Sequence, residues 1–403
     1  MIIHSPQKSI QQGSVTISSR FEFNKPISFI PEELWYRFPS KFSEKTNLQM
    51  DAFAPSALLL AMYTGEDLFI KGNISPRIAY NLSEFHEIFL EWYPREFHRI
   101  KIHYENLEVI PPFEGETAVC TAFSGGVDSF YTLWSHIQDN QSIPQARLTH
   151  GVFIKGLDLR LEDGDNFDKT FKIYDQIYKK LGLELIPAAT NAYLFSEFRI
   201  DWTIFFGVSL IGAALLLSPW MQRFYVPSGQ TSYQNLFPQG SSPITDHLLS
   251  NEATDIVHHG TTISRFDKIN TLVQWPVTHH RIRVCSDKRS LSSVNNCSVC
   301  HKCYRTMIYL ELLNANQFYD NFKKKMSVVD FIRWGTIKPL NRIHAKSILK
   351  RAFQTKRYRI AFWIRVTLLL DSLRKTILNS AKFFLKQDTL FKMKRKIFKP
   401  ENK

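Results

Sequence analysis

A loop with two adjacent glycines separates an apolar strand from a helix in the middle of the chain. The strand is predicted at residues 117–123, and the helix that follows the loop ends near residue 138. Between them stands the hexad Ser124-Gly125-Gly126-Val127-Asp128-Ser129. A strand, a tight glycine turn and a helix in direct succession fix the direction of the chain at this point. The helix must pack back against the sheet to which the strand belongs.

This loop has the properties of a phosphate-binding site. Two glycines let the backbone turn so that its N–H groups point into one concavity, and the helix N-terminus adds partial positive charge and unpaired donors. The hydroxyls of Ser124 and Ser129 can donate hydrogen bonds. Asp128 would either cap the helix or hold a magnesium ion on the phosphates. We therefore predict a phosphate-binding loop, and the alternative is a glycine turn with an aspartate cap.

The residues that follow the loop alternate between strands and helices. Strands are predicted at 148–155, 184–188 and 224–226, and helices at 167–181 and 202–217. Repeated strand–helix–strand units indicate an α/β domain whose parallel sheet is covered on both faces.

Ligands of such sheets bind beyond the carboxyl ends of the strands. The residues that directly follow the predicted strands are therefore candidates: Gly156, Asp158, Thr190, Asn191, Ser228 and Gly229. Asp246 stands in a polar loop, 239–250, that can close over a substrate. Three cations further on, Arg265, Lys268 and Arg305, can neutralise a triphosphate or a leaving pyrophosphate. For each residue the alternative is an ordinary turn, cap or surface position.

Residues 202–222 carry no charge, and about 20 apolar residues suffice to cross a bilayer. Pro219 interrupts the stretch, and Asp201 and Arg223 flank it closely. A buried helix at 202–217 is favoured, and no transmembrane segment is predicted. The first twelve residues lack the apolar core of a signal peptide. A cytoplasmic location is therefore expected.

Four of the five cysteines lie within nineteen residues, at the spacing C-x11-C-x2-C-x2-C. They are Cys285, Cys297, Cys300 and Cys303. Four thiolates at about 2.3 Å form a closed tetrahedral zinc site, which is structural rather than catalytic. An iron–sulfur cluster takes the same ligands, and a redox-active pair is a further alternative. The spacing favours Zn2+, with His301 as a bystander, and Cys120 is expected in the core.

The basic residues are concentrated near the C-terminus. Residues 322–403 contain 23 Lys+Arg and 4 Asp+Glu, whereas the first 321 residues contain 28 and 33. A helix is predicted here from apolar residues at helical spacing, namely Phe362, Val366, Leu369, Leu373, Ile377, Phe384 and Leu385. A basic amphipathic helix can attract nucleic acid, an acidic protein or an anionic membrane surface. The alternative is a solvated helical appendage.

Three segments are therefore predicted. Residues 1–112 form a mixed α+β unit without a catalytic motif, and residues 113–315 form the nucleotide-binding α/β domain with the cysteine cluster. Residues 316–403 form the basic helical region.

Two of these motifs together resemble a known family. The hexad 124–129 matches every position of S-G-G-x-D-S, the motif of the PP-loop ATP pyrophosphatase superfamily. The four cysteines, followed by Arg305, resemble the zinc segment of 7-cyano-7-deazaguanine synthase (QueC)-like proteins, and residues 264–268 loosely resemble that family's [ST]-K-x-E-[IL] segment. The likeness covers about residues 117–312. The chain departs from the synthase in its cysteine spacing, its loop at 228–250 and its two additional end segments.

The resemblance implies an adenine nucleotide alpha hydrolase-like, Rossmann-like fold that binds ATP and Mg2+ beside a structural Zn2+. Members of the superfamily cleave ATP between the α- and β-phosphates. With the strand-end positions included, the predicted nucleotide contacts are Ser124, Gly125, Gly126, Val127, Asp128, Ser129, Gly156 and Arg305. The predicted catalytic residues are Ser124, Asp128, Arg265 and Lys268.

The implied activity is that of a ligase. The chain would adenylate a carboxylate, on a 7-deazaguanine-type substrate, with release of pyrophosphate, and an amine or ammonia would then attack. Divergent QueC-like proteins of this longer build occur in antiphage-defence operons of the Qat and CBASS types, where a partner protein is the expected target. Modification of tRNA and a non-catalytic nucleotide-sensing role are the alternatives.

Overall fold

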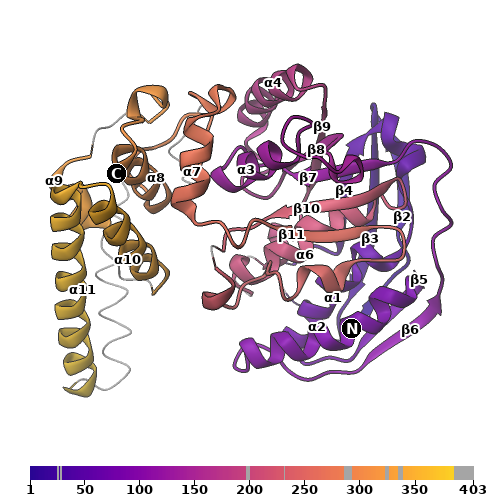
Figure 1. Cartoon of the computed structure of the whole chain (residues 1–403). Helices are drawn as coiled ribbons and strands as arrows, with labels where there is room; N and C mark the ends of the chain where they lie inside the picture. Colours follow the sequence, from indigo (N-terminus) through magenta and orange to yellow (C-terminus); the bar gives the residue numbers. More distant parts are fainter. Residues whose placement is uncertain are drawn as a thin grey trace. The chain divides into compact units, whose positions relative to one another are not determined.

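Eleven strands form one sheet in the part of the chain that carries the glycine loop (Figure 1). The computed structural model describes residues 1–24, 27, 30–196, 200–230, 232–285, 293–322, 326–334 and 339–384. The strands are β1 (Ile2–Ile3), β2 (Gln7–Gln11), β3 (Ser14–Glu22), β4 (Glu33–Pro39), β5 (Leu68–Ile74), β6 (Ile102–Leu107), β7 (Ala118–Ala122), β8 (His150–Lys155), β9 (Glu184–Thr190), β10 (Met221–Pro227) and β11 (Asp255–His259). The helices are α1 (Ala54–Thr64), α2 (Pro76–Trp92), α3 (Val127–His136), α4 (Gly164–Lys180), α5 (Tyr193–Ser196), α6 (Trp202–Leu215), α7 (Arg265–Val273), α8 (His301–Leu312), α9 (Val328–Trp334), α10 (Pro339–Gln354) and α11 (Tyr358–Phe384).

The strand order is β11-β10-β7-β8-β9-β4-β3-β1-β5-β6, with β2 paired to β3. All pairings from β11 to β9 are parallel. The strand β9 then pairs antiparallel with β4. The α/β class and a largely parallel sheet are therefore confirmed. The strand β11, which the sequence analysis did not predict, extends the parallel part of the sheet by one strand.

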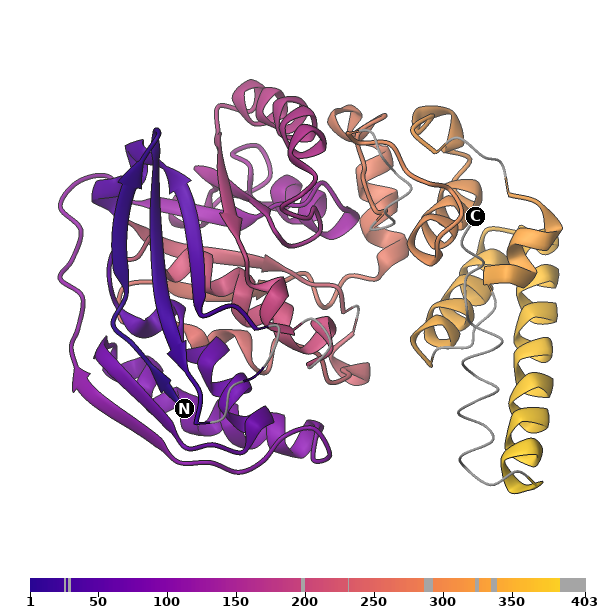
Figure 2. The same ribbon diagram turned by 180° about the vertical axis from the view of Figure 1, so that it is seen from behind.

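Helices cover both faces of the parallel strands (Figures 1 and 2). On one face α3 and α4 lie against β7, β8 and β9, and on the other α6 packs on β10 and α1. The helix α6 is buried along its length, which confirms the prediction of a buried helix. Its glycines allow close approach, because a Cβ at Gly207 would collide with the carbonyl of Gly240 and one at Gly212 with the Tyr36 hydroxyl. Among the described residues no helix is long and apolar enough to span a membrane.

The chain separates into two compact units, Met1–Asn295 and Asn296–Lys403. The predicted boundary near residue 112 falls inside the first unit, between β6 and β7. Strand β4 joins the two parts of the first unit, because Tyr36 pairs with Thr190 and Arg37 with Ala189 of β9. The prediction of three segments, 1–112, 113–315 and 316–403, concerns independently folding parts of the chain. It stays a prediction.

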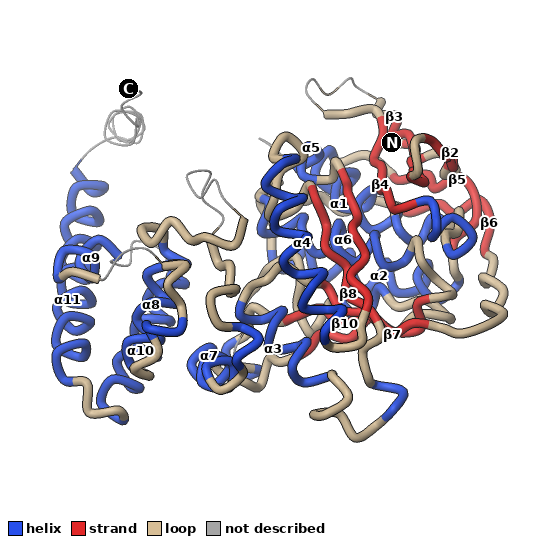
Figure 3. Tube along the Cα trace, turned by 90° about the horizontal axis from the view of Figure 1, so that it is seen from above, coloured by secondary structure: helices blue, strands red, loops and turns tan. Residues whose placement is uncertain are grey.

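In the second unit the described residues form the helices α8 to α11. Buried aromatic side chains, among them Tyr309, Tyr319 and Trp334, form its core. The helices α9 and α10 both pack against α11 (Figures 1 and 3). A buried hydrogen bond of 2.8 Å from the Tyr304 hydroxyl to Asp330 ties α8 to α9. The helical part of the predicted C-terminal region is therefore confirmed as far as Phe384, and Leu385 lies outside the described residues.

A buried carboxylate connects three segments of the first unit. Asp51 is fully buried. It accepts a hydrogen bond of 2.8 Å from the backbone N–H of Ser75, just before α2, and one of 2.9 Å from Asn251 Nδ2, in the loop before β11. Burial raises the pKa of Asp51 from 3.8 to about 6, although the two hydrogen bonds act in the opposite direction.

We predict that Asp51 makes the stability of the fold depend on pH. A carboxyl group whose pKa is higher in the folded state favours folding below its unfolded pKa, and this contribution is lost as pH rises through the folded value. The raised pKa of Asp51 corresponds to about 3 kcal/mol. The unfolding free energy of Asp51→Asn minus that of the wild type should therefore rise by about 3 kcal/mol as the pH is raised from about 4 to about 7. Urea denaturation at each pH measures both free energies. A difference between the two proteins that is independent of pH would contradict this prediction.

Candidate glycine-loop site

The glycine loop lies between the carboxyl end of β7 and the start of α3. Gly125 has a φ of +73°, a conformation that side chains rarely adopt. A Cβ at this position would also collide with the ring of Tyr174. Gly126 is the N-cap residue, and α3 begins at Val127. The loop therefore requires glycine at 125 for conformation and for space, and it presents the N-terminus of a ten-residue helix.

Two cations meet the carboxylate of Asp128 on this loop. Arg265 Nη2 lies 2.8 Å from Oδ2, and Lys268 Nζ lies 3.0 Å from Oδ1. The side chains of Asp128, Arg265 and Lys268 are 19%, 10% and 1% exposed. Three of the four predicted catalytic residues are thus brought together. The fourth, Ser124, lies with its Oγ 3.5 Å from the Oγ of Ser129.

The helix α7 places both cations. Ser264 caps it, since its hydroxyl accepts a hydrogen bond from the N–H of Asp267. Arg265 and Lys268 stand three residues apart and therefore share one face of the helix. Lys268 Nζ also donates to the carbonyl of Ser228, just after β10, at 2.8 Å. Burial lowers the pKa of Lys268, while the charge of Asp128 acts to raise it.

A further cation, Arg283, was not predicted from the sequence. Its backbone N–H donates to the carbonyl of Gly125 at 2.8 Å, and its side chain is buried. The Tyr174 hydroxyl holds the same segment by donating to the carbonyl of Arg281 at 3.1 Å. In the sequence Arg283 carries no motif, so only the fold of the segment before Cys285 reveals it.

Two donor atoms of these arginines make no hydrogen bond to the described part of the protein. Within the described residues, the buried Nε atoms of Arg265 and Arg283 have no hydrogen-bond partner. A buried N–H of a charged group without an acceptor is costly. Arginine and lysine side chains beside a helix N-terminus and a glycine turn are suited to a polyanion. The site therefore carries the donors that a chain of phosphates requires.

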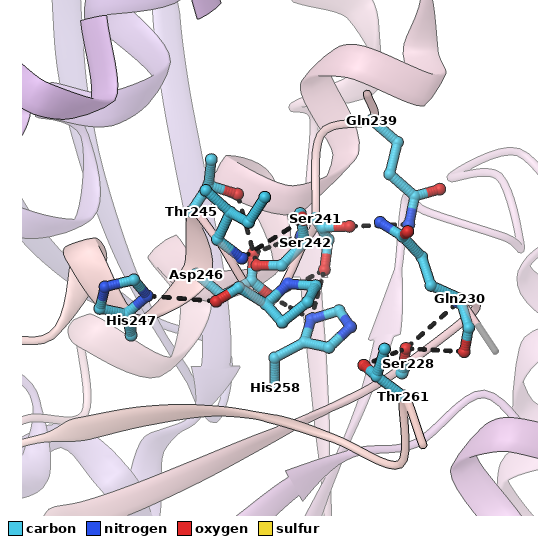
Figure 4. Close-up of polar contacts among 12 residues, drawn as sticks. Ser228, Gln230, Gln239, Ser241, Ser242, Thr245, Asp246, His247, His258 and Thr261 are labelled. Atoms are coloured by element: carbon cyan, nitrogen blue, oxygen red, sulfur yellow. Dashed lines mark hydrogen bonds and ion pairs between the residues drawn. The ribbon is translucent and has the colours of Figure 1, made fainter. Parts of the chain in front are cut away.

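A second polar cluster lies at the ends of β10 and β11 (Figure 4). His258 Nδ1 lies 2.7 Å from Asp246 Oδ2, and both side chains are buried. Since a carboxylate only accepts, Nδ1 carries the proton that joins the pair. Asp246 also accepts from Ser241 Oγ at 2.7 Å and from the N–H of Ser242 at 3.0 Å. The sequence analysis placed Asp246 in a loop that could close over substrate, but it did not connect the residue with His258.

The other ring nitrogen of His258 is not used by the contact with Asp246. Among the described residues, Nε2 is buried and has no hydrogen-bond partner. In Figure 4 the ring lies between Asp246 and the side on which Ser228 and Thr261 are found. A histidine that donates through Nδ1 to a carboxylate presents Nε2 as an acceptor. His258 can therefore accept a proton at the same edge of the sheet as the glycine loop.

Other predicted strand-end residues serve the fold. Gly156 has a φ of +95°, and a Cβ there would collide with the carbonyl of Thr190. Thr190 Oγ1 donates to the carbonyl of Trp35 at 2.8 Å, and Asn191 Oδ1 accepts from the N–H of Trp35 at 2.9 Å. These contacts hold β4 on β9, which accounts for both polar residues. The role of Gly156 in nucleotide binding stays a prediction.

Arg305 belongs to α8 in the second unit. Its guanidinium contacts Nε2 of His344 on α10. The structure thus places this residue in a contact between two helices, and its predicted contact with the nucleotide stays a prediction.

The four clustered cysteines can hold a metal ion. Their sulfur atoms all lie within 4.8 Å of one another. Cys303 Sγ is 3.8 Å from that of Cys297 and 3.4 Å from that of Cys300. In a tetrahedral zinc site with bonds of about 2.3 Å, the sulfur atoms are about 3.8 Å apart. The thiols therefore fit a zinc ion by type, number and separation. The fifth cysteine, Cys120, is buried in β7, as predicted.

Comparisons of the chain with protein-family models, with curated proteins and with solved structures give no match.

We predict that the purified chain contains about one zinc ion, because a site of four thiolates is closed and binds tightly. Cys300→Ser should lose most of this metal, whereas Cys120→Ala, which alters a cysteine outside the cluster, should keep it. Elemental analysis by mass spectrometry measures both. Equal zinc in the two variants would contradict the assignment. Iron together with inorganic sulfide would instead identify the site as an iron–sulfur cluster.

Proposed function

We propose that this chain is an ATP-dependent ligase of the PP-loop type, similar to QueC. It adenylates a carboxylate and then joins the acyl group to an amine or ammonia. The observation that carries the proposal is the set of buried cationic donors around the glycine loop, above all the unpartnered Nε atoms of Arg265 and Arg283. These donors and the helix N-terminus call for a ligand with several negative charges. A triphosphate carries several negative charges and fits these donors, and the hexad 124–129 favours ATP.

The residues of the loop bind and orient the nucleotide. The backbone N–H groups at the start of α3 and the hydroxyls of Ser124 and Ser129 contact the phosphates. Lys268, Arg265 and Arg283 neutralise the charge that develops on the leaving pyrophosphate. Asp128 holds Arg265 and Lys268 in place through its two ion pairs. A magnesium ion, when bound, would add Lewis-acid stabilisation of the same phosphate oxygens, and a carboxylate oxygen of Asp128 is a suitable ligand for it.

The reaction needs no base in its first half and one in its second. A substrate carboxylate attacks the α-phosphorus, the bond to the β-phosphate oxygen breaks, and pyrophosphate leaves. An amine then attacks the acyl carbon, AMP leaves, and the nitrogen loses a proton. His258 Nε2 accepts that proton, because Asp246 holds the ring through Nδ1 and stabilises the cation that forms. The 7-deazaguanine acid and a target in antiphage defence are the substrate class and setting that the motifs favour.

We predict that the purified protein forms AMP and pyrophosphate, not ADP, from ATP, magnesium and 7-carboxy-7-deazaguanine. Asp128→Ala releases two buried cations from their partner and should lower AMP formation by about a hundredfold or more. Arg283→Met should weaken nucleotide binding by about tenfold. Separation of the nucleotides by chromatography and titration calorimetry measure these two effects.

The matched control is Arg37→Met, since Arg37 is exposed on β4 and takes no part in the loop. It should behave like the wild type. Absence of AMP from folded, zinc-loaded protein would rule out this acid as the substrate. Equal nucleotide affinity in Arg283→Met and Arg37→Met would remove the physical basis of the proposal.

We further predict that His258→Gln separates the two halves of the reaction. Amide formation from added ammonia should fall by about a hundredfold, because the proton acceptor is lost. Pyrophosphate release without an amine should stay within about twofold of the wild type, because a carboxylate needs no base. The control is His247→Gln, which changes an exposed histidine next to Asp246. Equal losses in both half-reactions would show that His258 only supports the fold.

A further inference from the structure

The helix α11 is apolar on two opposite sides. Its inner face is buried through Ile360, Ala361 and Ile364, and it packs against α9 and α10. Its outer face carries four large apolar side chains that are 58–67% exposed. These are Phe362, Leu369, Leu373 and Ile377. A surface helix normally carries one apolar stripe, which faces the core, so a second apolar face on the solvent side requires a separate explanation.

The outer residues form one continuous strip. At about 100° per residue, the four side chains lie within about 80° of one another around the helix axis, and they span about 23 Å along it. Tyr358, at the start of the helix, is 64% exposed and continues the strip. The Phe353 ring, 40% exposed, lies 6.4 Å from that of Tyr358. Isolated exposed apolar residues need no explanation, but a strip of this length marks an interaction site.

Cations border the strip on both sides. Arg365 and Arg374 are exposed and stand on opposite flanks of it, and Arg359 is exposed at the N-terminal end. The Arg365 guanidinium lies over the Phe353 ring at 4.8 Å. Residues 322–403 have 23 basic and 4 acidic side chains, so this segment of the chain has a strong positive net charge. The partner must therefore offer apolar contact along a line and negative charge beside it.

We propose that the outer face of α11 binds the surface of a membrane that contains anionic lipids. A helix with an apolar strip and flanking arginines lies in the interface, with the strip among the acyl chains and the cations among the headgroups. A second copy of the chain would set the same arginines against one another. Nucleic acid would engage the cations but leave four apolar side chains without a partner. The proposal is independent of the chemistry at the glycine loop.

The test is flotation of the full-length protein with phospholipid vesicles. Binding to phosphatidylcholine vesicles that contain phosphatidylglycerol should exceed binding to pure phosphatidylcholine by about tenfold or more, and it should weaken as salt is raised. Leu369→Asp/Leu373→Asp should lower binding to the anionic vesicles by about tenfold or more, and so should Arg365→Glu/Arg374→Glu.

The matched control is Leu107→Asp/Val109→Asp. It introduces the same two charges at apolar residues of the first unit that are 54% and 51% exposed, and it should bind like the wild type. All altered side chains are exposed, and thermal unfolding and zinc content verify that each variant is folded. Undiminished binding by the leucine variant would overturn the proposal.

Two other outcomes would overturn the proposal in favour of another partner. Absence of vesicle binding together with self-association that the leucine variant abolishes would assign the strip to a second copy. RNA binding that the arginine variant alone abolishes, again without vesicle binding, would assign the face to nucleic acid.

Discussion

The two ion pairs of Asp128 are the contact on which the arrangement of the first unit's site depends. They join α3, which follows β7, to α7, which follows β11, and β10 lies between these two strands in the sheet. Lys268 adds the end of β10 through the carbonyl of Ser228. One buried lysine therefore fixes the relative positions of three connections at the carboxyl edge. Two cations and one carboxylate leave a net positive charge there, which a ligand with several negative charges can balance.

The first part of the chain completes the sheet rather than standing beside it. Because β4 pairs antiparallel with β9, β9 is not an edge strand but lies inside the eleven-stranded sheet. Thr190 and Asn191, at the end of β9, use their hydrogen-bonding groups on Trp35 and Glu33 of β4. This side of the carboxyl edge is consequently closed by structural contacts. The glycine loop and His258 lie away from these contacts, at the ends of β7 and β11.

Local sequence signals were sufficient for the parallel strands β7 to β10, the glycine turn and the buried helix α6, because apolar runs and glycine pairs determine these structures locally, without distant partners. The strand β11 was missed because Asp255–His259 contains an aspartate and two histidines and is not an apolar run. It is recognised as a strand only by its pairing with β10. The partnership of Asp246 with His258 spans twelve residues and a change of element. Arg283 had no signal at all, since its place depends on hydrogen bonds made by Tyr174 and Gly125.

The distribution of charge separates the two surfaces to which we assign ligands. Residues 1–295, the first unit, contain 26 basic and 31 acidic side chains, so the cations at the glycine loop are a local exception on a weakly acidic unit. The attraction of these cations for the proposed phosphate ligand would act over a Debye length of about 8 Å at physiological salt and would depend on burial. Residues 322–403 carry an excess of positive charge over a whole region, which suits an extended anionic surface rather than a single small ligand. In the two proposals the same type of side chain thus acts by close contacts at the glycine loop and by its number in residues 322–403.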